Sequence, residues 1–174
     1  MTIKKSFDGL FHKMKSKLTK PESGAIMQFK KEVEKRINEA RMQLSFSDLV
    51  TPTFLINKGG EIEAHDFIFD EKNKDKEIER MNILCKDPGV ETSALIFDSY
   101  VNDCSEKEAE HMTGSLKGQE NTQSALTVML YTREKVLLRT LIYTRKGAQK
   151  YLWSDKGWEE IPTPQGRLAN PFLN

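Results

Sequence analysis

The sequence is poor in cysteine and has no long apolar run. Its 174 residues include only two cysteines, Cys85 and Cys104, whereas a small secreted domain held by disulfides needs more. No run approaches the roughly eighteen consecutive apolar residues of a membrane-spanning helix. The apolar residues near the N-terminus are periodic, and no small-residue cleavage site follows them, which argues against a signal peptide. These absences predict a soluble, cytoplasmic protein.

Recognisable catalytic and metal-binding motifs are also absent from the sequence. A structural zinc site takes its ligands as two close pairs, but Cys104 and His111 stand seven residues apart, and no second pair accompanies them. The segment 113–118 lacks the Gly-Lys-Ser/Thr ending of a phosphate-binding loop. We therefore predict no metal and no cofactor, and the sequence favours a non-enzymatic protein while leaving an enzyme as an alternative.

What the sequence does contain is a basic amphipathic segment in its first twenty residues. Six apolar side chains recur there at helical spacing and would form one stripe: Ile3, Phe7, Leu10, Phe11, Met14 and Leu18. Six lysines and one aspartate accompany them, so the segment carries a net charge of +5. The stripe must be covered by the chain's own core, by a partner protein or second copy, or by an anionic membrane surface. We predict that its side chains from Phe7 to Leu18 bind a protein partner or a second copy, with a peripheral membrane contact as a variant.

The charge along the rest of the chain is uneven. Residues 61–110 hold fifteen acidic and six basic side chains, a net charge of −9, and residues 111–174 hold five acidic and nine basic, a net of +4. An acidic middle between basic ends can pair within the molecule or head to tail between copies. A nucleic-acid binder usually concentrates positive charge on its folded part, so nucleic acid is an unlikely partner.

Periodicity divides the remaining chain into a helix and a sheet. A second helix with one apolar face is predicted to end near Leu44, and its face comprises Ile26, Phe29, Val33, Ile37, Ala40 and Leu44. From Thr51 the alternation predicts strands at 53–57, 62–69, 92–101, 124–132 and 135–145, with a helix at 70–86. Residues 149–154 favour a further strand that ends in a turn at 155–157.

The predicted fold class is α+β. We expect a mostly antiparallel β-β-α-β-β-β sheet with helices on one face, preceded by an N-terminal helical hairpin or arm. The predicted organisation is amphipathic helices at 1–48, a sheet domain at 49–161 and an extended tail at 162–174. Over about residues 51–145 this element order resembles the profilin-like and longin or roadblock group of domains, many of which are scaffolds. Separately, Asp98-Ser99-Tyr100 followed by 123–145 resembles small bacterial and phage proteins, a resemblance that implies no activity.

Two charged residues interrupt strands that are otherwise apolar, namely Asp98 and Arg139. Burying a charge is costly unless it is paired, so the sequence suggests an ion pair between them with Tyr100 and Tyr143 nearby. The functional interpretation is a polar pocket for an anion or a carboxylate ligand, formed by these four residues, which would make the chain a small-ligand-binding protein or an enzyme. The structural interpretation is a plain ion pair or two solvated side chains, which is the commoner case.

A third hypothesis concerns the basic and aromatic residues of the C-terminal strands. Cations between Arg133 and Lys150 alternate there with tyrosines and Trp153, a pattern that can stack single-stranded bases. The acidic middle of the chain would repel a phosphate backbone. The sequence thus favours an interaction or accessory protein that docks through its N-terminal segment.

Overall fold

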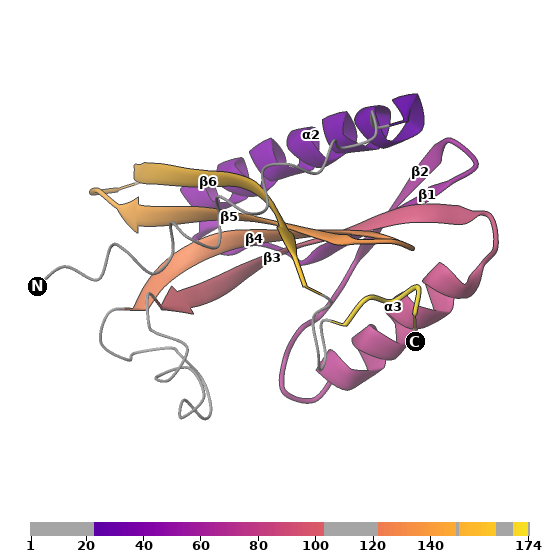
Figure 1. The fold of residues 1–174 in the computed structure, drawn as a ribbon. Helices are drawn as coiled ribbons and strands as arrows, with labels where there is room; N and C mark the ends of the chain where they lie inside the picture. Colours follow the sequence, from indigo (N-terminus) through magenta and orange to yellow (C-terminus); the bar gives the residue numbers. More distant parts are fainter. Residues whose placement is uncertain (1–22, 103–121, 149, 163–168, 174) are drawn as a thin grey trace, which may run out of the picture.

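The structure is a computed structural model, and it describes residues 23–102, 122–148, 150–162 and 169–173. These residues form, in chain order, α2 (Gly24–Ser47), β1 (Thr53–Lys58), β2 (Glu61–Asp66), α3 (Lys74–Lys86), β3 (Val90–Asn102), β4 (Thr122–Thr132), β5 (Val136–Arg145) and β6 (Tyr151–Ile161). All six of these strands form one antiparallel sheet, in the order β2-β1-β3-β4-β5-β6 (Figure 1). The predicted α+β class and antiparallel sheet are confirmed.

The helix α2 begins and ends at identifiable caps. Ser23 precedes it, and the Ser23 hydroxyl accepts a hydrogen bond from the backbone N–H of Ile26 at 3.4 Å. Its buried face comprises Phe29, Val33, Ile37, Ala40 and Leu44, which confirms the predicted stripe except for the half-buried Ile26. The helix ends at Ser47, and the capping residue Asp48 has a left-handed backbone (φ 56°) and donates its N–H to the Leu44 carbonyl.

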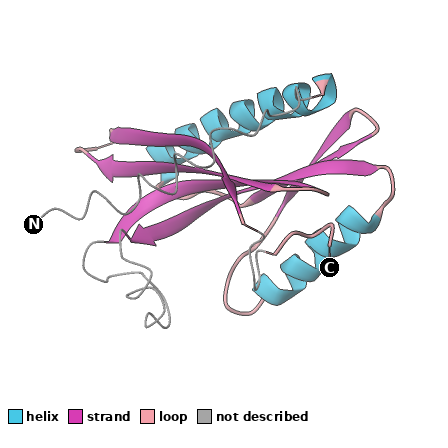
Figure 2. Ribbon diagram, viewed as in Figure 1, coloured by secondary structure: helices cyan, strands magenta, loops and turns pink. Residues whose placement is uncertain are grey.

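The two helices lie on opposite faces of the sheet, which corrects the predicted placement on one face (Figure 2). The helix α2 packs on the face that carries Leu55 of β1. On the other face, α3 packs Met81 and Cys85 against Phe54 and Ile56 of the same strand. Successive strand residues point to opposite faces. The continuous apolar run of β1 therefore makes both faces of the sheet apolar, and each face needs a helix.

The strand β6 is longer than the sequence predicted. Instead of ending in a turn at residues 155–157, it continues to Ile161, with a register shift opposite the stretch from Arg139 to Leu141. Gly157 adopts a φ of 74° at this irregularity, a backbone conformation that glycine tolerates best. A bulge of this kind inserts turn-like residues without ending the strand, and it places both Trp153 and Trp158 on the α2 face.

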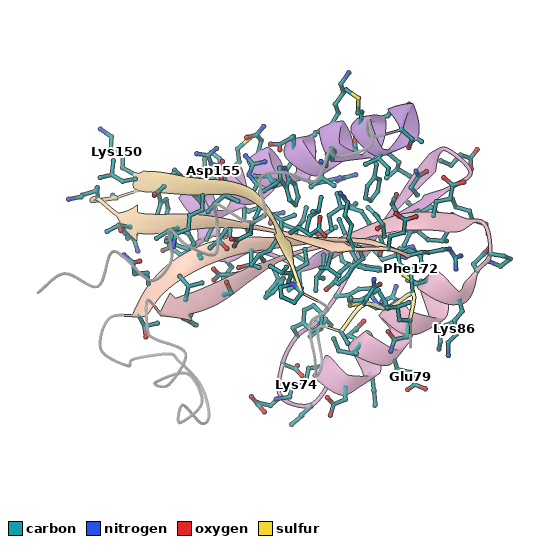
Figure 3. The ribbon with its side chains drawn as sticks, viewed as in Figure 1. Lys74, Glu79, Lys86, Lys150, Asp155 and Phe172 are labelled. Carbon is teal, nitrogen blue, oxygen red and sulfur yellow. The ribbon has the colours of Figure 1, made fainter. Side chains whose placement is uncertain are left out.

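The amphipathic segment at residues 1–20 lies outside the described residues. At the other end of the chain, Asn170 is buried and its side-chain Nδ2 donates to the carbonyl of Thr132 at 2.7 Å. Phe172 packs against the core on the α3 face (Figure 3). This part of the C-terminal segment thus returns to the sheet.

Candidate functional site

Arg139 lies on β5 under α2, and its charge is matched by two carboxylates. Its Nη2 lies 2.6 Å from Asp155 Oδ2 and its Nε 3.1 Å from Asp155 Oδ1, while its Nη1 donates to Glu34 of α2. Figure 3 shows Asp155 on β6, on the side of the sheet that carries α2. Hydrogen bonding to Asp155 raises the pKa of Arg139 and lowers that of Asp155. Arg139 therefore ties α2 to the sheet.

The predicted ion pair between Arg139 and Asp98 does not form. Asp98 on β3 faces Leu126 of β4, which faces Leu141 of β5, so one whole strand separates the two charged residues. The sequence gives the strands but not their lateral order, and this order decides which charges can meet.

Asp98 is instead bonded to Tyr143, another of the predicted site residues. The Tyr143 hydroxyl donates to Asp98 Oδ1 at 2.7 Å. Although Asp98 as a residue is exposed, loss of water around its carboxylate raises the pKa of Asp98, and the bond from Tyr143 opposes this rise. Desolvation, and then the bond to Asp98, raises the pKa of Tyr143.

Aromatic rings pack around this hydrogen bond at the end of the sheet. The Tyr143 ring lies 5.4 Å from that of Tyr151 and 5.1 Å from that of Trp153, measured between centroids. Tyr100 lies in the same lateral row as Tyr143, through Ser124 of β4, and is exposed. The structure thus brings Asp98 and Tyr143 into contact, with Tyr100 nearby, and leaves Arg139 in a separate network four residues along β5.

Hydrogen bonds and a cation–π contact hold the C-terminal end of α2 against this aromatic cluster. Asp48 accepts hydrogen bonds from Arg145 Nη1 at 3.0 Å and from the Tyr151 hydroxyl. The guanidinium of Arg41 lies 4.6 Å from the Trp153 ring centroid, a cation–π contact. These contacts fix the point at which the chain leaves α2 and turns toward β1.

An apolar groove opens next to this point, and we call it the α2-end groove. Its volume is about 470 Å³. Three stretches line it: Leu49, Val50, Thr51 and Pro52 after α2; Phe67, Ile68, Phe69 and Asp70 after β2; and Phe97 with Asp98 on β3. Asp98 therefore joins the predicted site to this groove.

The groove exists because β1 is shorter than β3. Pairing between the two strands begins at Thr53 and Ile96, while β3 continues to Asn102. Within the described part of the chain, no strand pairs with β3 on this side beyond Ile96. The rings of Phe67, Phe69 and Phe97 form the wall, with neighbouring centroids 5.9 and 6.4 Å apart.

Large apolar side chains project from the groove and its rim into solvent. Leu49 is 72% exposed and Ile68 is 61% exposed. One turn before Leu49, Phe46 on α2 is 77% exposed. Single exposed apolar residues are ordinary on protein surfaces, whereas here Leu49 and Ile68 stand exposed in the same apolar groove.

The described residues hold no group of side chains suited to a metal ion. They contain no cluster of three or more His, Cys, Asp and Glu side chains that could hold a metal ion. Cys85 is buried, and desolvation raises the pKa of its thiol to about 11, which keeps the thiol protonated and unreactive at neutral pH. Cys104 and His111 lie outside the described residues. No helix in the described part of the chain is long and apolar enough to cross a membrane.

Comparison with protein-family models, with curated proteins and with solved structures finds no match for this chain. The candidate site therefore depends on its geometry alone.

Sequence reasoning missed the exposed apolar residues of the α2-end groove. Phe46 falls off the buried stripe of α2, Leu49 lies two residues beyond the end of this helix, and Ile68 lies two residues beyond the end of β2. Phe46 and Leu49 share one signal, a large apolar side chain that no periodic pattern places in the core. Ile68 lacks this signal, because the alternation at 62–69 assigns it to a strand.

Proposed function

We propose that this chain is a non-enzymatic interaction protein. The observation that supports the proposal best is the α2-end groove, an apolar surface in which Leu49 and Ile68 stand exposed. A protein that acted alone would gain stability by burying such side chains, at about 25 cal/mol per Å² of apolar surface. Their exposure is typical of a surface completed by a binding partner.

The docking element on the chain's own side is the basic amphipathic segment at residues 1–20. Burying Phe7, Leu10, Phe11 and Met14 would contribute on the order of 6–10 kcal/mol before the costs of association are subtracted. The surrounding lysines favour an acidic receptor, whether a protein surface or an anionic membrane.

Two alternative functions have less support from the described contacts. An anion pocket at Arg139 would compete with the two carboxylates that already bind this side chain. A stacking surface for single-stranded nucleic acid would need accessible rings, but Tyr131 is fully buried and Arg41 lies over Trp153. The polar cluster at Asp98 and Tyr143 stays a candidate for a small ligand.

The proposal is tested by comparing two charge-matched double variants of the full chain. Phe7→Asp with Phe11→Asp places two charges on the stripe, whereas Ser6→Asp with Ser16→Asp adds the same charge beside it. We expect the first variant to lose self-association, measured by light scattering, or binding to phosphatidylserine vesicles, and the second to keep it. If the Phe variant retains all assembly and lipid binding shown by the wild type, the segment is not a docking element.

A further inference from the structure

The α2-end groove has the apolar lining of a receptor for an amphipathic helix. Its wall is aromatic, formed by Phe67, Phe69 and Phe97, and its rim is aliphatic, with Leu49 and Ile68 directed toward solvent. A helix that binds a groove inserts side chains from one face, spaced three and four residues apart. The occupant must therefore present such an apolar face.

The charge beside the groove restricts the occupant further. Asp70 and Asp98 line the groove itself. The stretch 61–71, which forms the edge strand β2 and the groove wall after it, contains five acidic residues and no lysine or arginine. Two cations of α3 lie against this stretch: Arg80 lies over the Phe67 ring and pairs with Glu77 at 3.4 Å, and Lys74 pairs with Glu71 at 2.8 Å. Asp66 and Asp70 have no ion pair with either of them among the described contacts. An apolar face flanked by positive charge suits this surface best.

The chain itself carries a segment of this kind. Residues 3–18 combine an apolar stripe with spacings of three and four, and the first twenty residues carry a net charge of +5. The outward face of α2 is a poorer receptor for it, because its first half exposes Lys31 and Lys35, which would repel the lysines of the segment.

The length of chain before α2 determines whether the groove can bind the N-terminal segment of its own copy or only that of another copy. The helix α2 is about 36 Å long at 1.5 Å per residue, and the groove lies at its far end from Ser23. Five extended residues join Leu18 to Ser23 and span at most about 17 Å. With residues 3–18 helical, Phe11 can then lie no more than about 28 Å from Ser23. Most of the stripe thus falls short of the groove of its own copy.

We infer that the α2-end groove binds the amphipathic N-terminal segment of a second copy of this chain. The stripe from Phe7 to Leu18 packs on the aromatic wall, and its lysines face Asp70 and the acidic edge of β2. Because each copy offers both a groove and a segment, the exchange is reciprocal and closes at a two-fold symmetric dimer. This inference rests on the proposed function and adds the receptor and the partner.

The structure offers a closely matched pair of variants for the groove. Ile68 is 61% exposed in the groove, and Ile83 on α3 is 60% exposed outside its lining. For the full chain we expect a solution mass of twice 20.0 kDa by light scattering. We expect Ile68→Asp to shift it to that of the monomer, and Ile83→Asp to leave it unchanged. A wild type that stays monomeric, or a dimer that survives Ile68→Asp, overturns the inference.

A second measurement distinguishes exchange between copies from docking within one. Equal amounts of ¹⁵N-labelled and unlabelled full chain are mixed and treated with a zero-length carbodiimide, which joins lysine amines to carboxylates. Exchange predicts cross-links from Lys13 or Lys15 to Asp70 that join labelled to unlabelled peptides. Cross-links only within one isotope would mean that each segment binds its own copy.

The inference and the proposed function can fail separately. The dimer could be lost in the variant with Phe7→Asp and Phe11→Asp but kept in the Ile68→Asp variant. In that case the N-terminal segment is a docking element, but the α2-end groove is not its receptor. The wild type could instead be a monomer that binds vesicles, with this binding lost in the variant carrying Phe7→Asp and Phe11→Asp. That result would identify a membrane as the partner and would overturn exchange of segments between copies.

Discussion

At the scale of single residues, the charged side chains of Arg139 and Asp98 within the sheet are bound by other residues of the chain. Arg139, with a side chain only 14% exposed, binds Asp155 and Glu34 at once. The sequence correctly marked Arg139 and Asp98 as charges that need partners. It could not identify those partners, because Glu34 lies 105 residues away along the chain and β4 lies between β3 and β5.

We expect Arg139→Met to lower the free energy of unfolding by about 2 kcal/mol, because it leaves two carboxylates facing each other without a cation. Arg139 lowers the pKa of Asp155 below 3.8, so this difference should shrink as the pH falls through that lowered pKa. Urea unfolding at about pH 7 and about pH 3 measures both effects.

The control for Arg139→Met is Lys135→Met, which removes a more exposed ion pair with Glu160 at 3.9 Å. It should change the free energy of unfolding by less than about 0.5 kcal/mol. Equal effects of the two substitutions would show that the Arg139 network adds nothing beyond an ordinary surface pair.

Asp98→Asn tests the desolvation of the Asp98 carboxylate. The folded state raises its pKa above 3.8, so the ionised carboxylate destabilises the fold increasingly as the pH rises through that raised pKa. The amide can still accept the Tyr143 hydroxyl bond but never ionises. We therefore expect the stability of the variant, relative to wild type, to be higher at about pH 7 than at about pH 4, as measured by urea unfolding. A relative stability that falls with pH would mean that the bonds to the carboxylate outweigh its desolvation.

At the scale of elements, periodicity predicted the existence and type of each described helix and strand, and it failed where an element depends on its neighbours. The strand β6 passes through a bulge that looks like a turn in sequence. The helices cover two faces because β1 is apolar on both. The α2-end groove arises because β1 pairs with β3 only as far as Ile96, which no local pattern reveals.

The end of α2 provides a test of how this junction is held. Asp48 combines a left-handed backbone with bonds to Arg145 and Tyr151. Asp48→Ala loses the bonds and strains the backbone, whereas Asp48→Gly loses only the bonds. We expect the Ala variant to be the less stable by about 1 kcal/mol in urea unfolding. Equal stability of the two variants would show that the junction relaxes out of the left-handed conformation.

At the scale of the whole molecule, α2 and the sheet share one core. The buried face of α2 packs on residues of β1, β3, β4 and β5. The sequence alone left open whether the predicted N-terminal helices pack on their own sheet. A shared core of this kind unfolds as one unit.

We therefore expect urea unfolding of the full chain to follow a single transition, with the same midpoint by far-ultraviolet circular dichroism and by tryptophan fluorescence. Phe29→Ala in α2 should shift both midpoints together, with a loss of about 3–5 kcal/mol. A fluorescence midpoint that stays in place while the helical signal moves would separate α2 from the sheet.

The central claim is that the basic N-terminal segment docks on the acidic, apolar α2-end groove. Its most direct test is titration of a fluorescent peptide of residues 1–20 with the full chain carrying Phe7→Asp and Phe11→Asp, whose own segment cannot compete. The account predicts saturable binding that weakens with salt and disappears when Ile68→Asp is added. Absence of saturable binding, or binding indifferent to Ile68→Asp, would contradict it.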